Sequence, residues 1–148
     1  MDEAKMKLYK DVIKGTALLL FLSFFFLPLV QCSQDSSLTA SGWEIAIGTG
    51  LGNLYAEASG ESGNSLAFAL IVIPFVLLVF ALANEPFAVL RNTSVVGLLI
   101  KVAFIIAAYV QMNSEDYRGY FTLTMFNWLV LAIYVGICVL TNYCRKFE

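Results

Sequence analysis

The run Leu66–Ala83 constrains this chain more than any other feature of its sequence. It contains 18 consecutive residues without a charged, amide or hydroxyl side chain. As a helix it spans about 27 Å, close to the hydrocarbon thickness of a bilayer. Only 14% of the 148 residues are charged, whereas a soluble domain carries about a quarter. The chain is therefore predicted to be a membrane protein.

Three further hydrophobic segments accompany this run, and together they predict the fold class. We expect an all-α membrane protein, a four-helix transmembrane bundle that forms a single domain over residues 1–148. A short interfacial element is expected in its first outer loop, residues 31–65. The expected spans cover about residues 12–30, 66–83, 95–112 and 120–140.

The first hydrophobic segment has two interpretations. Its lysine-rich start and apolar centre are typical of a first membrane span or of a signal peptide. The segment Leu29-Val30-Gln31-Cys32 is close to a lipoprotein cleavage motif, but Gln31 stands where a small residue is wanted. We favour an uncleaved span.

Basic residues predict the orientation. Positive charge collects on the cytoplasmic side of membrane proteins. With both termini in the cytoplasm, the outer loops hold only Arg118. The inner segments then hold Lys5, Lys7, Lys10, Lys14, Arg91, Arg145 and Lys146.

The outer loop contains a pattern that favours a short helix. Ser41 and Glu44 have the spacing of a capping box, and Trp43 and Ile47 would share one helical face. A strand is the alternative, because Trp43, Ile45 and Ile47 alternate. Trp43, Glu44 and Ile47 are the candidate contact residues of this loop.

Composition excludes several classes of function. The chain has no histidine, so histidine-dependent triads and histidine metal sites are excluded. No Cys-x-x-Cys pair is present, and Cys32 is expected on the opposite side from Cys144. No basic patch suggests nucleic acid. We expect no catalytic residue, no metal site and no cofactor, and a protein that is not an enzyme.

Apart from Lys14 at the cytoplasmic start of the first span, Lys101 is the only lysine, arginine, aspartate or glutamate inside an expected span. Its long side chain can extend to the headgroups of the cytoplasmic side, about 9 Å away at helical rise. Alternatively, it lines a cavity or pairs with an acid such as Glu85. Both interpretations remain open from the sequence.

Other residues in the last two spans are candidates for helix contacts. Gln111 and Asn127 can form a hydrogen bond between the third and fourth spans. Small residues at spacings that let helices approach closely are Ala103, Ala107, Ala132 and Gly136. If several copies form a pore, the available polar lining is Lys101, Gln111, Asn127, Thr122 and Thr124.

Three short motifs follow one another early in the chain: Leu27-Pro28, Cys32-Ser33 and Ser41-Gly42-Trp43-x-Ile45-Ala46-x-Gly48. They resemble a group of small, largely uncharacterised bacterial four-span membrane proteins. The resemblance covers about the first third of the chain and implies fold and topology only. Separately, we expect a bacterial inner (plasma) membrane location.

Two functions follow as expectations. The first is a non-enzymatic membrane subunit that forms homo-oligomers or docks a larger membrane complex within the lipid bilayer. The second is a homo-oligomeric pore or channel, in the manner of a defence or toxin-like effector. A small transporter is less favoured, because no acidic residue lies inside a span.

Overall fold

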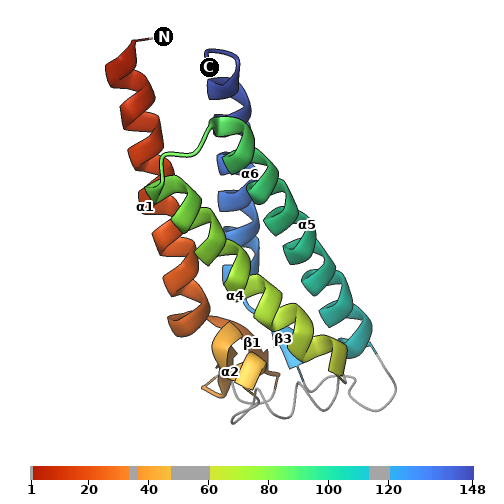
Figure 1. The fold of residues 1–148 in the computed structure, drawn as a ribbon. Coiled ribbons are helices and arrows are strands. Elements are labelled where there is room, and N and C mark those ends of the chain that lie inside the picture. The colour runs from red at the N-terminus through yellow and green to blue at the C-terminus, as the bar shows by residue number, and fades with distance from the viewer. Residues whose placement is uncertain (1, 34–36, 48–60, 114–120) are drawn as a thin grey trace.

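Four long helices form the body of the protein. The computed structural model describes residues 2–33, 37–47, 61–113 and 121–148, with residues 61–66 as backbone only. The helices alternate in direction, so that the start of the first and the end of the last lie at the same end (Figure 1). Their bounds are α1 Glu3–Phe26, α4 Glu61–Leu82, α5 Phe87–Met112 and α6 Phe126–Arg145. In packing, α4 contacts α1 and α5, and α5 contacts α6.

The helices bury one face and expose large apolar side chains on the other. Ile13, Ala17, Leu20 and Phe24 form the buried stripe of α1, at the spacing of a helical face. On the outer surface, apolar side chains such as Leu99 remain more than 60% exposed. By length and composition, α5 and α6 are sufficient to cross a membrane, and Ala67–Leu82 is a shorter apolar segment.

The observed ends of the first helix differ from the expected span of 12–30. The helix begins at Glu3, so the lysine-rich segment is part of the helix and does not precede it. It ends at Phe26, and Pro28 starts a strand. Since proline disfavours helical geometry in the residue before it, the helix stops two residues short of Pro28.

The turn between α4 and α5 is shorter than predicted. The expected span of 95–112 treated residues 84–94 as a turn, but helix α5 already starts at Phe87. Asn84 ends α4 with a left-handed backbone (φ 56°), and the Glu85 N–H donates to the Phe80 carbonyl at 3.0 Å. Polar side chains do not break α5 there, because the Ser94 hydroxyl donates to the Leu90 carbonyl within the helix at 2.7 Å.

The last helix is displaced along the chain relative to its expected span of 120–140. It runs from residue 126 to residue 145. The residues before it, Phe121–Leu123, form a strand instead. The prediction for 66–83 was close, since α4 ends at Leu82.

A small antiparallel sheet closes the end of the body opposite the chain termini (Figure 1), and the all-α prediction omitted it. The central strand β1, Pro28–Cys32, pairs with β2, Thr39–Ser41, on one side and with β3, Phe121–Leu123, on the other. In register, Val30 faces both Ala40 and Leu123. The sheet therefore ties the end of α1 to the residues that lead into α6.

The short helix expected in the outer loop is confirmed as α2, Gly42–Ile47. Its capping box is reciprocal: the Ser41 N–H donates to Glu44 Oε2 at 2.7 Å, and the Glu44 N–H donates to Ser41 Oγ at 3.3 Å. Ile45 and Ala46 are buried, and α2 packs on α4. The alternative of a strand through Trp43, Ile45 and Ile47 is wrong, because β2 ends at Ser41.

Replacing Ser41 with alanine is expected to destabilise α2 by about 1 kcal/mol, because the Glu44 N–H loses its acceptor. Hydrogen exchange at the Glu44 amide measures this local effect, with Thr39→Ala in the exposed part of β2 as the control. Unchanged protection of Glu44 in the Ser41 variant would show that the box does not hold the helix.

Candidate functional site

Lys101 lies in the interior of the protein. Its side chain has no exposed surface, and its position 14 residues after Phe87 places it about 21 Å along α5. The Lys101 Nζ donates to Asn127 Oδ1 at 2.7 Å. The rings of Phe104 and Phe24 lie 5.0 and 5.8 Å from the same nitrogen, within the range of a cation–π interaction.

These contacts decide between the two interpretations of Lys101. The prediction that its side chain reaches the surface is wrong, because the ammonium is turned inward to α6. Pairing with Glu85 is also wrong in this geometry: Glu85 lies in the turn before α5, and Lys101 donates to Asn127 instead. The error arose from placing the start of the helix at Val95 rather than at Phe87.

Asn127 links the lysine to the sheet. Its side-chain Nδ2 donates to the Leu29 carbonyl at 2.7 Å and to the Thr124 carbonyl at 3.2 Å. The Thr124 hydroxyl donates to the Pro28 carbonyl, and the Thr124 N–H donates to the Leu29 carbonyl at 3.1 Å. We refer to Lys101, Asn127, Thr124 and the carbonyls of residues 28 and 29 as the Lys101–Asn127 network.

The network joins three elements that are distant in sequence, namely α5, the start of α6 and strand β1. Each Asn127 side-chain atom that can form a hydrogen bond does so, and both Lys101 and Asn127 are fully buried. Buried polar groups of this kind are costly unless they are paired. The arrangement therefore fixes the position of the sheet against the helices.

Gln111 does not take part in this network. The predicted pair of Gln111 and Asn127 is replaced by the pair of Lys101 and Asn127. Gln111 lies ten residues further along α5, beside the helix end at Met112, and is half-buried.

The predicted small-residue faces point mainly away from the body of the protein. Ala103, Ala132 and Gly136 are exposed, and Ala107 is half-buried. A side chain added at Gly136 would meet no atom within 4 Å. At Gly136, therefore, none of the other described helices packs against this face of α6.

An apolar groove between α1 and α6 contains Gly136. Its volume is about 280 Å³. Apart from Gly136, its lining residues are Val12, Ile13, Thr16, Ile133, Ile137 and Leu140.

The close helix approach inside the protein occurs at Gly97, which the sequence analysis did not single out. A Cβ atom at Gly97 would lie 2.5 Å from Tyr134 Cε1 and 2.8 Å from Ile73 Cγ2. Tyr134 is fully buried, and its hydroxyl has no hydrogen-bond partner within the described residues. The only sequence signal for this close approach was a glycine inside an apolar segment. The residues that it contacts lie on α4 and α6, so residue spacing within α5 does not identify them.

The candidate residues of α2 have two roles. Trp43 and Ile47 are exposed, and the Trp43 ring lies 5.4 Å from the ring of Phe25. Glu44 is held by the capping box. Trp43 and Ile47 are therefore the surface residues of α2.

The three cysteines, Cys32, Cys138 and Cys144, are free. Within the described residues, no group of three or more histidine, cysteine, aspartate or glutamate side chains is placed to hold a metal ion.

A scan against protein-family models, a search of curated proteins and a search of solved structures each found no match to this chain. The resemblance to small bacterial four-span membrane proteins therefore stays a prediction.

Proposed function

We propose that this chain is a small, non-enzymatic membrane protein that crosses the bilayer four times and self-associates through the outer face of α6. The observation that carries the proposal is the outward position of Ala132 and Gly136 beside the apolar groove between α1 and α6. Small residues let helices approach closely in lipid, and among the described residues no other helix packs against this face at Gly136.

Three features support four spans with both termini in the cytoplasm. The long helices expose large apolar side chains along their lengths. The start of α1 and the end of α6 lie at the same end of the body (Figure 1). Basic residues also gather at that end, on the first turns of α1 and the last turn of α6, as the positive-inside rule requires of a cytoplasmic face. We propose a bacterial inner membrane as the location.

Reporters fused before Met1 and after Glu148 are expected to lie on the same, cytoplasmic side of the membrane. A third reporter, inserted after Ser33 beside strand β1, is expected on the opposite side. Paired enzymatic reporters that are active on only one side of the membrane measure this. Opposite locations for the two termini would disprove four spans.

Replacing Gly136 with isoleucine is expected to weaken self-association by about tenfold, because a branched side chain would hold a second helix away. Fluorescence energy transfer between labelled copies of the full chain, diluted in liposomes, measures the dimer fraction. Gly15→Ile is the matched control, because Gly15 is also an exposed helical glycine with no atom within 4 Å of an added Cβ. An equal effect of both variants, or of neither, would count against the α6 face.

The geometry favours association over a pore. A pore lined by Lys101 and Asn127 needs both side chains at an interface between copies, whereas here they are buried inside one chain. Thr124, another candidate for the lining, is buried and donates to the Pro28 carbonyl.

A further inference from the structure

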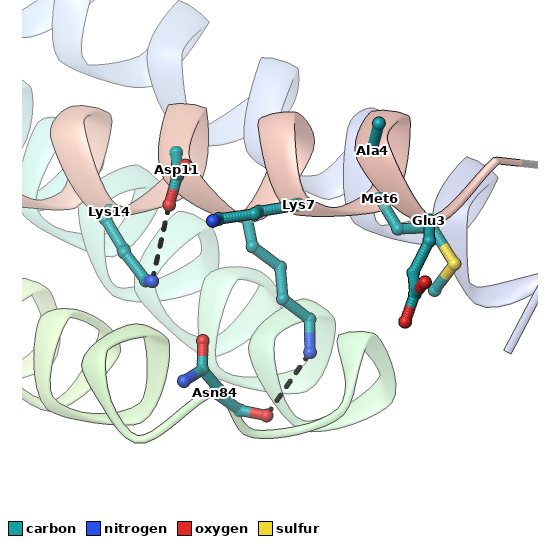
Figure 2. A pocket seen from close by; sticks show the side chains of 8 residues that line it. Glu3, Ala4, Met6, Lys7, Asp11, Lys14 and Asn84 are labelled. Atoms are coloured by element: carbon teal, nitrogen blue, oxygen red, sulfur yellow. Dashed lines mark hydrogen bonds and ion pairs between the residues drawn. The ribbon is translucent and has the colours of Figure 1, made fainter.

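A second pocket lies at the end of the body that holds both chain termini (Figure 1). It has a volume of about 580 Å³ and is formed by the first turns of α1 and by the turn after α4. Three lysines and two carboxylates line it, so it carries a net positive charge. Its polar side chains are Glu3, Lys7, Lys10, Asp11, Lys14 and Asn84 (Figure 2).

The lysines of this pocket occupy one face of α1. Lys7, Lys10 and Lys14 are separated by three and four residues, a spacing that aligns side chains along a helix. Two of them are held in place: Lys10 Nζ donates to the Asn84 carbonyl at 3.3 Å and lies 5.4 Å from the centre of the Phe87 ring. Lys14 forms an ion pair with Asp11 at 3.4 Å. Since each ammonium has three N–H donors, both lysines keep donors for a ligand.

The turn after α4 provides a fixed wall. The left-handed backbone of Asn84 directs its carbonyl toward Lys10, and the side chain of Asn84 faces Lys14 and Asp11 across the opening (Figure 2). A site of this kind, with several ammonium groups around a concave opening, suits a phosphate group.

Apolar side chains adjoin the charged pocket. Ala4 and Met6 are apolar residues of its lining, and Leu82, two residues before Asn84 at the end of α4, is 61% exposed. A ligand with a phosphate and an apolar part would contact both kinds of surface. Lysines directly beside a membrane span attract anionic lipids for the same electrostatic reason.

We propose that this pocket binds the phosphate of an anionic phospholipid headgroup, with Lys7, Lys10 and Lys14 as donors and the acyl chains beside Met6 and Leu82. The proposal rests on the membrane location proposed above. It places a lipid contact on the cytoplasmic ends of α1 and α4, away from the α6 face.

Native mass spectrometry of the full chain in neutral detergent, titrated with short-chain phosphatidylglycerol, tests this site. We expect retained phosphatidylglycerol, and binding about tenfold weaker in Lys7→Gln/Lys14→Gln. Lys5→Gln is the matched control, since Lys5 is on the same helix but does not line the pocket. Glu3→Gln removes a carboxylate from the pocket and is expected to tighten binding about two- to threefold, a gain that misfolding cannot produce.

Three results would overturn the proposal. One is equal weakening by Lys5→Gln and the double variant, which would indicate unspecific surface charge. Another is equal retention of zwitterionic phosphatidylcholine. The third is displacement of the lipid by glycerol phosphate at equal concentration, which would identify a soluble phosphate as the ligand. Each result is distinguishable from a failure of the proposed function. The lysine variants do not change the α6 face, so they are expected to leave the dimer fraction of the chain unchanged.

Discussion

Replacing Asn127 with leucine is expected to lower the free energy of unfolding by about 3 kcal/mol, because the buried Lys101 amino group loses its hydrogen-bond acceptor. The variant removes the acceptor of the Lys101 ammonium and the donor to the Leu29 carbonyl together. Reversible unfolding of the full chain in mixed detergent micelles measures the change.

A second substitution distinguishes the buried charge from a simple packing effect. Lys101→Met alone leaves Asn127 Oδ1 without its donor and is expected to cost about 1–3 kcal/mol. In Lys101→Met/Asn127→Leu the unpaired ammonium is gone, so the double variant should be more stable than Asn127→Leu alone. Losses that simply add would mean that the two side chains are not coupled.

The same network predicts where the Asn127→Leu variant loosens first. Strand β1 is held to the start of α6 by Asn127 and Thr124. Hydrogen exchange at the β1 amides should therefore increase more than at the buried centre of α4. Uniform exchange along the chain would show that the network contributes global stability without positioning the sheet.

Replacing Gly97 with alanine is expected to destabilise the protein by about 1–3 kcal/mol through overpacking. The added Cβ would lie 2.5 Å from Tyr134 Cε1, and the Tyr134 ring is fully buried. Because that ring cannot move into solvent, α5 must shift relative to α4 and α6. The same unfolding measurement in mixed micelles gives the loss.

Gly136→Ala, in contrast, is not expected to destabilise the protein. It adds the same methyl group to an apolar helix, but at a position with no atom within 4 Å. Alanine is the better helix former, so the variant should be unchanged or more stable by about 0.5–1 kcal/mol. Equal losses for Gly97→Ala and Gly136→Ala would contradict the close approach at Tyr134.

Sequence patterns predicted structure correctly where the interacting residues are close together in the chain. The capping box of Ser41 and Glu44 predicted α2, because both partners lie within one helical turn. The uninterrupted run at 66–83 predicted α4 within one residue of its C-terminal end, because nothing polar competes with the helix there.

The boundaries that failed depended on polar side chains whose partners are backbone groups of the same helix. The expected span of 95–112 left Thr93 and Ser94 in the preceding turn, yet their hydroxyls donate to carbonyls four residues earlier in α5, at 3.0 and 2.7 Å. Such bonds satisfy the side chain inside a helix, so composition alone places the start of α5 too late.

The amino-acid sequence by itself determined that this chain forms long apolar helices, because hydrophobic runs and helical caps act over a few residues. The tertiary structure alone decided that Lys101 pairs with Asn127, that β1 pairs with β3, and that Gly97 accommodates Tyr134. Each of these contacts joins residues far apart along the chain. These contacts depend on how the helices pack together, so the spacing of residues along the sequence does not predict them.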